Sequence, residues 1–448
     1  MGESKNRTGG CRAFRDREPG CACRGGKGRF MANMISVEEA RELILANVPR
    51  LDEETVGVVD AAGRVAAQDQ VSDIDVSPFA HSAMDGFALR AAQIEGATAE
   101  SPVILRVIAE EAAGDVFEGP IGEGECVRIM TGAPLPSDAD SVVKYEIVGV
   151  VEGDGKPGSL VSFAEPTKLG SNVRAAGEEA RAGEAIIRDG EVVNAAGVGF
   201  LAGCGITELP VYRRPRIAII SIGSELVPPT EVPTPGKIRN SNSFALAAAA
   251  RQAGALPTIL PIVKDSQEAL AEEVLRAVRD YDFVLTSGGA SNGDFDFIKP
   301  VVESLGQLLM TTVNMRPGKA QTFGLVNGVP VFGLPGNPAA AYVGFQMLVR
   351  PALRKMQGYT RFDHPVVRAR LTETTKKNDP RRIFMRGVMW KGADGVYEAM
   401  SAGNQSSGLF GPIQRSNCMI VLPEGLEGRQ AGDMVDCLLL DVSEEVVL

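Results

Sequence analysis

The pattern of hydrophobic and polar positions changes its period along the chain, which predicts more than one kind of domain. From Ser36, the stretch SVEEARELIL repeats apolar residues every three to four positions, and Ser36 and Glu39 have the spacing of a helix-capping box. Between residues 73 and 183, short alternating runs such as PVILRVIAE and GSLVSF are separated by Gly, Pro and Asp. This alternation predicts a mostly β domain, inserted between two Val/Ala/Gly-rich segments.

At Arg213 the pattern changes to apolar runs that alternate with helical stretches. RIAIISI, DFVLTS and VPVFGL are continuous and rich in β-branched residues, which is typical of strands buried on both faces. Helical stretches such as SFALAAAARQAG and SQEALAEEVLRAVRD separate these runs, so we expect a parallel sheet with helices on both faces. After residue 358, strand-like runs such as VVRARLTET and CMIVLPEG return and predict a second β domain.

The expected protein is therefore multidomain, with α/β and β parts. Its 448 residues, 44% of them hydrophobic, are enough for several cores. The predicted parts are a disordered extension over 1–33, a central α/β sheet domain over 34–52 and 207–358, an elongated linking domain over 53–72 and 184–206, an inserted mostly-β domain over 73–183, and a C-terminal β domain over 359–448.

Charge and composition restrict the partners of the protein. The net charge of −11 argues against nucleic acid, and no apolar run reaches the roughly 18 residues of a membrane helix. Cysteines lie scattered in apolar contexts, as expected for reduced thiols of a cytoplasmic protein: Cys126, Cys204, Cys418 and Cys437. An acidic protein of this kind needs a locally basic pocket if its ligand is an anion.

Three unusual loops follow the predicted strands, at the sheet edge where open α/β proteins bind ligands. The loop GSEL carries Glu225. The other two loops consist mostly of small residues: Ser287, Gly288, Gly289 and Ser291 in SGGASNGDFD, and Pro335, Gly336 and Asn337 in LPGNP. Small residues allow backbone N–H groups to approach an anion, and a helix N-terminus adds partial positive charge. The pattern favours a site for a phosphate-like group.

Charged residues beside these loops suggest a cation and a basic patch. Asp294 and Asp296 could hold a divalent cation against phosphate oxygens, although a tight turn with solvated acids would look the same. In NMRPGKAQTFG, Arg316 and Lys319 flank a Pro-Gly turn and supply the basic patch, or else form a plain surface turn. No GxxxxGK[S/T] loop is present, no GxGxxG lies between a predicted strand and a predicted helix, and the chain has two histidines.

Six segments, taken in order, resemble one family. SPFAHSAMDGFAL, RIMTGAPLP, NVRAAGEE, TSGGASNGDFD, RPGKAQTFG and GLPGNPAAA follow one another as in molybdopterin molybdenumtransferases, and the likeness covers about residues 34–448. The resemblance implies an elongated homodimer with its site in a cleft between subunits. It also implies a reaction in which molybdenum from molybdate enters adenylylated molybdopterin with Mg²⁺ present, and AMP is released.

The resemblance also assigns roles to individual residues. The acidic catalytic residues fall on Asp85, Glu179, Glu225 and Asp296, and Glu225 joins Asp294 and Asp296 of the loop in the predicted metal set. The substrate-binding cations fall on Arg174, Arg316 and Lys319, and molybdate would suit Arg386 with Ser406 or Ser407 in GNQSSGLFG. Asn240 and Ala340 stand where many members of the family have Asp and Ser.

Two other functions fit parts of the pattern. An adenylyltransferase or pyrophosphatase acting on a pterin or nucleotide could use the same sheet edge, but the two β domains argue against it. A non-catalytic pterin-binding or scaffold paralogue would keep the pocket without turnover.

Overall fold

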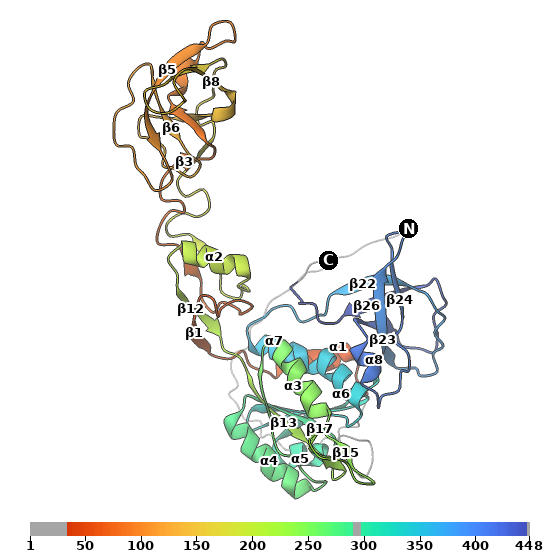
Figure 1. Cartoon of the computed structure of the whole chain (residues 1–448). Helices are drawn as coiled ribbons and strands as arrows, with labels where there is room; N and C mark the ends of the chain where they lie inside the picture. Colours follow the sequence, from red (N-terminus) through yellow and green to blue (C-terminus); the bar gives the residue numbers. More distant parts are fainter. Residues whose placement is uncertain (1–33, 290–296, 446–448) are drawn as a thin grey trace, which may run out of the picture. The chain divides into compact units, whose positions relative to one another are not determined.

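The computed structural model describes residues 34–289 and 297–445, and Figure 1 shows their helices and strands coloured along the chain. No helix in these two ranges is both long enough and apolar enough to cross a membrane. The predicted helix after Ser36 is confirmed as α1 (Val37–Ala46), and its capping box is complete: the Ser36 hydroxyl accepts from Glu39 N, while the Glu39 carboxylate accepts from Ser36 N.

A six-stranded sheet forms the α/β part, in the order β16-β13-β17-β21-β20-β18. Four of its strands are parallel, as predicted: β13 (Arg216–Ser221), β16 (Leu256–Ile259), β17 (Phe283–Ser287) and β21 (Val329–Leu334). The expectation of a parallel sheet is wrong at one edge, where β20 (Ala320–Val326) pairs antiparallel with β21 and β18 (Gln307–Thr312) pairs antiparallel with β20. The reason is a two-residue turn between β20 and β21, Asn327-Gly328, in which both residues have positive φ and which therefore makes a hairpin.

Helices cover both faces of this sheet and define two cores. On β13, Ile217 and Ile219 belong to one core, whereas Ala218 and Ile220 belong to the other, because side chains alternate across a strand. The first core includes residues of α1, α3 (Asn242–Gln252), α6 (Pro338–Gly344), η3 (Phe345–Val349) and α7 (Arg350–Met356). The second includes residues of α4 (Gln267–Asp280) and α5 (Ile298–Leu305).

The segments on either side of the inserted part pair with each other. The strands are β1 (Glu53–Gly57) with β12 (Glu208–Tyr212), and β2 (Gln70–Val71) with β11 (Ala185–Ile187), all antiparallel. The helix α2 (Ala195–Gly203) contributes Leu201 to a small separate core with Ile187 and Val211.

The inserted part is mostly β, as its alternating pattern predicts. Its main sheet has the order β7-β4-β6-β5-β9-β8, with the bounds β4 (Gly86–Leu89), β5 (Val103–Glu111), β6 (Glu125–Ile129), β7 (Ser141–Lys144), β8 (Val148–Glu152) and β9 (Leu160–Phe163). A short ribbon joins β3 (His81–Ser82) to β10 (Val173–Arg174). Two short 3₁₀ turns, η1 (Ala91–Ile94) and η2 (Tyr145–Ile147), complete it.

The C-terminal strands pair in a closed ring, since the order β23-β24-β22-β26-β25 returns to β23. Their bounds are β22 (Val366–Leu371), β23 (Arg382–Lys391), β24 (Tyr397–Ser401), β25 (Cys418–Leu422) and β26 (Met434–Leu439), with the short helix α8 (Gly411–Gln414) before β25. A two-residue strand from the α/β part, β19 (Met315–Arg316), pairs parallel to β23. This pairing brings the RPGK segment beside the C-terminal β part.

Candidate functional site

The loops after β13, β17 and β21 meet at the carboxyl edge of the sheet, as the pattern of strands predicts. Ile222 N donates to Ser287 O at 2.9 Å, and Gly288 N donates to Leu334 O at 3.1 Å. The loops, with the short strands β14 (Leu226–Val227) and β15 (Ile238–Arg239), surround a small pocket of about 80 Å³. Its wall includes four predicted site residues: Glu225, Ser287, Gly288 and Gly336.

Close packing explains the glycines in the loop after β17. Gly288 has φ +90°, and a Cβ placed there would lie 2.2 Å from the carbonyl oxygen of Ile222. Gly289 has φ +64°, and its Cβ would lie 3.0 Å from Cδ1 of Ile222. A side chain at Gly288 would collide with the backbone of Ile222. The loop after β17 therefore needs glycine to pack against the loop after β13, independently of any ligand.

Asn242 connects two of the loops, and the sequence patterns did not single it out. Its Nδ2 donates to Ser287 Oγ at 2.8 Å and to Gly336 O at 2.8 Å. Its Oδ1 is buried and has no hydrogen-bond partner within the described part of the chain. The signal in the sequence is weak, an Asn in RNSNSF at the start of α3, because its two partners lie far away along the chain.

Asn240 is buried in a cluster of hydroxyl groups on the same wall. Its Oδ1 accepts from Ser221 Oγ at 3.1 Å, and its Nδ2 lies 3.2 Å from Ser243 Oγ, to which it donates. Its exposed fraction is 5%. Both polar atoms of this amide therefore take part in local hydrogen bonds.

A larger cavity of about 670 Å³ lies between the RPGK loop, the start of α6 and the C-terminal β part. It brings together seven predicted residues: Arg316, Lys319, Pro335, Asn337, Arg386, Ser406 and Ser407. Lys376 and Arg381, which the sequence patterns missed, add two more cations to its wall. No Asp or Glu is among the described residues that line it, so this cavity is the basic pocket expected of an acidic protein.

Backbone contacts join the two sides of this cavity. In the pairing of β19 with β23, Met315 lies opposite Arg382, and Ala339 N donates to Ser407 O at 2.8 Å. Gly318, at the turn of the RPGK loop, has φ +97°, and a Cβ there would lie 2.7 Å from a side-chain nitrogen of Gln321. The turn therefore requires glycine, and it places Lys319 on the cavity wall.

Arg386 is the most buried cation of the cavity, with an exposed fraction of 2%. Its Nη2 donates to Ser406 O at 3.2 Å, while its Nε has no hydrogen-bond partner in the described ranges. Burial, reinforced by the charge of Arg316, lowers the pKa of Arg386 to about 10. A buried guanidinium with an unused N–H group is suited to an oxyanion.

Three predicted residues lie on the inserted β part and line neither cavity. Asp85 Oδ1 accepts from Thr131 N at 2.8 Å and from Thr131 Oγ1 at 2.7 Å, and these hydrogen bonds lower the pKa of Asp85. Arg174 forms an exposed ion pair with Glu178 at 2.9 Å, and Glu179 is exposed. All three side chains are exposed, and of the three Asp85 is the one held by hydrogen bonds to a neighbouring loop.

The predicted metal ligands are mostly outside the part that the structure describes. Ser291, Asp294 and Asp296 all fall in residues 290–296, and of the predicted metal set Glu225 alone is described, with an exposed side chain. Within 34–289 and 297–445, no group of three or more His, Cys, Asp or Glu residues could hold a metal ion. The metal site therefore stays a prediction.

The fold and the two cavities define a multidomain protein whose α/β part borders a basic cavity, and comparison with known proteins specifies the family. Three family models match: the MoeA N-terminal region (domain I and II) over 35–205, a probable molybdopterin binding domain over 218–355, and the MoeA C-terminal region (domain IV) over 368–440.

Whole-length relatives agree with these models. The chain is 33% identical over 419 residues to a molybdopterin molybdenumtransferase of Staphylococcus aureus, covering 93% of this chain and 98% of that protein. It is 34% identical over 420 residues to the corresponding protein of Staphylococcus epidermidis, covering 92% and 98%. The crystal structure of a molybdopterin biosynthesis MoeA protein from Pyrococcus horikoshii matches with a TM-score of 0.78 at 27% identity, covering 91% of this chain and 100% of that one. This chain belongs to the molybdopterin molybdenumtransferase family.

Proposed function

We propose that this protein is the enzyme that inserts molybdenum into molybdopterin, using molybdate and adenylylated molybdopterin as substrates and releasing AMP. Membership of the family supports the reaction, since its curated relatives are molybdopterin molybdenumtransferases. The observation that carries the proposal within this chain is the cavity of about 670 Å³ with five cationic side chains and, among its described residues, no carboxylate.

Molybdate, a tetrahedral dianion, is proposed to bind at the buried end of this cavity. Arg386 supplies a guanidinium whose Nε has no partner in the described chain. Ser406 and Ser407 line the same cavity, and their hydroxyls would donate to the anion. Lys319 and Arg316 add charge from the opposite side. Because Arg386 has little water around it, its interaction with a dianion is less screened than that of an exposed cation.

The phosphate groups of the second substrate are proposed to bind at the small pocket of about 80 Å³. The two cavities share the LPGNP loop, since Gly336 lines the small one and Asn337 lines the large one. Backbone N–H groups of the small-residue loops around this pocket would hold the phosphates without a counter-charge. The LPGNP loop would thus lie between the bound molybdate and the phosphate bond whose cleavage releases AMP.

Mg²⁺ is proposed as the cofactor, held by Glu225 with Asp294 and Asp296. Carboxylate oxygens are the ligands that Mg²⁺ prefers, and Glu225 faces the small pocket, so the donor chemistry fits. When bound, the ion would neutralise charge on the phosphate oxygens. The described residues by themselves do not complete such a site.

A homodimer is proposed to complete the cleft. Asp85, Arg174 and Glu179 carry the charges that the family resemblance assigns to catalysis and substrate binding, and none of them lines either cavity of the α/β part. A second copy would supply them.

Buried, free thiols at four cysteines support a cytoplasmic location: Cys126, Cys204, Cys418 and Cys437.

The test is to mix the purified protein with adenylylated molybdopterin, Mg²⁺ and molybdate, and to follow AMP by chromatography. Molybdate-dependent release of AMP, together with reactivation of a molybdenum-free molybdoenzyme by the product, is expected. Binding of the pterin without either outcome would favour a non-catalytic paralogue. Release of AMP without any dependence on molybdate would instead indicate a pyrophosphatase.

A further inference from the structure

We propose that Asp379 is a positioning residue that fixes two of the three arginines of the large cavity, Arg316 and Arg381, and thereby sets which oxyanion the cavity selects. Asp379 is absent from the cavity wall, and neither the sequence motifs nor the family resemblance assign it a role. The inference rests on the proposed function of this cavity as the molybdate site.

The Asp379 carboxylate links two arginines that do line the cavity. Its Oδ1 accepts from Arg381 N at 3.0 Å and from Arg381 Nε at 2.8 Å, and its Oδ2 accepts from Nη1 of Arg316 at 3.2 Å. The side chain of Asp379 has an exposed fraction of 13%. Both carboxylate oxygens are therefore occupied by guanidinium groups, in a position largely shielded from water.

This contact determines how much of Arg316 is available to a ligand. Nη1 of Arg316 is used by Asp379 and by Asn378 Oδ1, each at 3.2 Å, while the side chain as a whole is 45% exposed. An arginine on a two-residue strand would otherwise sample several rotamers, and ordering it on binding would cost conformational entropy. Because Asp379 and Asn378 hold Nη1, the remaining N–H groups of Arg316 keep a defined orientation and are available to a ligand in the cavity.

The same carboxylate also fixes the backbone that carries the RPGK loop. Arg381, held by Asp379, donates from its Nη1 to Met315 O at 3.2 Å. Met315 and Arg316 form β19, which pairs with β23. Asp379 therefore determines both the orientation of Arg316 and the attachment of its strand to the C-terminal β part.

Removal of the charge should have two effects of opposite sign. Asp379 stays ionised at neutral pH, since the Arg381 side chain lowers its pKa far below the usual range. Without that negative charge, the positive potential of the cavity rises, which favours any small dianion. At the same time the two arginines lose their fixed geometry, which weakens binding of the anion that the geometry fits. A positioning role thus predicts a loss of selectivity rather than a uniform loss of affinity.

The experiment compares molybdate with sulfate, a smaller tetrahedral dianion, by isothermal titration of the full-length protein at fixed ionic strength. For Asp379→Asn we expect the molybdate affinity to fall about tenfold while sulfate affinity stays the same or rises. The KM for molybdate should rise with kcat changed by less than about twofold. Asp379→Glu, which keeps the charge, should restore part of the selectivity.

The matched control is Asp394→Asn, since Asp394 pairs with Arg370 at 2.9 Å in the same β part and does not line the cavity. This control should leave both affinities unchanged. An unchanged ratio of molybdate to sulfate affinity in Asp379→Asn overturns the proposal. So does a parallel loss of both anions with a large fall in melting temperature in both Asp379 variants, which indicates a purely structural role. If the unmodified protein binds neither anion, the proposed function of the cavity fails instead.

Discussion

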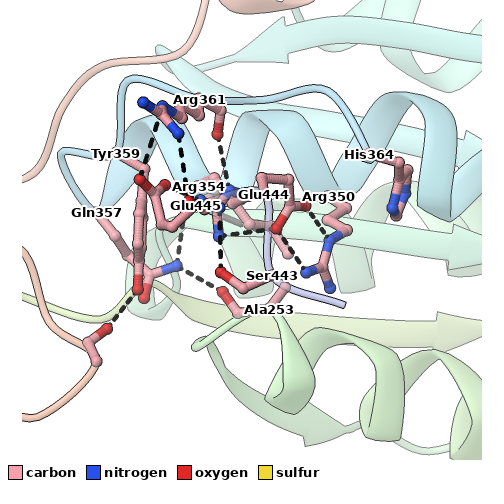
Figure 2. A network of polar contacts seen from close by, with 12 residues as sticks. Ala253, Arg350, Arg354, Gln357, Tyr359, Arg361, His364, Ser443, Glu444 and Glu445 are labelled. Carbon is pink, nitrogen blue, oxygen red and sulfur yellow. Dashed lines mark hydrogen bonds and ion pairs between the residues drawn. The ribbon is translucent and has the colours of Figure 1, made fainter. Parts of the chain in front are cut away.

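Glu444 accepts hydrogen bonds from Arg350 at both carboxylate oxygens, from Nε at 2.5 Å and from Nη2 at 3.0 Å, and its side chain is completely buried. Arg354 adds a second contact, with its Nη1 3.1 Å from Oε2 of the same carboxylate. Both arginines lie on α7, as Figure 2 shows, so the segment after β26 is held against the α/β part by buried charge.

Glu444→Gln is therefore expected to destabilise the fold by about 3–5 kcal/mol, because it leaves the buried Arg350 without its counter-charge and Arg354 with Glu445 alone. The free energy of unfolding from urea titration measures this. The control is Asp436→Asn, whose partner Arg368 lies 3.8 Å away in an exposed pair and which should cost less than about 1 kcal/mol. Equal losses in the two variants would contradict the argument.

His364 should make the fold sensitive to mild acid. Burial, helped by the charge of Arg350, lowers the pKa of His364, whose Nε2 lies 3.3 Å from Gln346 O. The unfolded chain takes up this proton near pH 6.5, so stability is complete above about pH 6.5 and falls as pH falls below it. Glu444, the neighbouring acid, also has a lowered pKa because hydrogen bonds from Arg350 outweigh its burial, and it loses its contribution in a lower pH range.

The measurement is the melting temperature between pH 7.5 and about pH 5. His364→Gln should flatten this profile, while His81→Gln, at the other histidine of the chain, should leave its slope unchanged. A profile with the same slope in unmodified protein and His364→Gln would show that other groups cause the acid sensitivity.

Arg386→Gln should weaken molybdate binding by about 10- to 100-fold, since it removes a charge-assisted donor from a buried position. Arg316→Ala with Lys319→Ala should also weaken it, and more strongly at low salt, where exposed charges are screened less. Isothermal titration with molybdate measures both. The control is Arg368→Gln, an exposed arginine on β22 that lines neither cavity. Unchanged affinity in Arg386→Gln would place the oxyanion elsewhere.

Asn240→Asp tests the metal site. The change places a carboxylate at a 5% exposed position and removes the donor to Ser243 Oγ, so without Mg²⁺ we expect a loss of about 1–3 kcal/mol. Because Asn240 lines the same pocket as Glu225, Mg²⁺ should offset this loss more in the variant than in the unmodified protein. Melting temperatures with and without millimolar Mg²⁺ measure the difference, and an identical effect of Mg²⁺ in both proteins would contradict a metal beside Glu225.

Local patterns in the sequence determined much of the fold. The capping box at Ser36 depends on residues three apart, and the buried strands depend on continuous apolar runs, so both are visible without tertiary contacts. The hairpin at Asn327-Gly328 has an equally local signal, and the expectation of a parallel sheet is wrong there because this turn reverses the chain. The position of the three loops at one sheet edge also followed, because carboxyl ends of parallel strands share an edge.

Only the tertiary structure showed that the predicted residues of the large cavity lie together, and which further residues join them. Asp379 contacts Arg316 across 63 positions of sequence, and Lys376 and Arg381 reach the wall because β19 joins the sheet of the C-terminal β part. Burial of Arg386, which leaves its Nε unused and lowers its pKa, likewise depends on strands that pair with β23 from distant segments. The protonation of a side chain and its hydrogen bonds depend on distances between side chains in space. Separation along the sequence does not specify those distances.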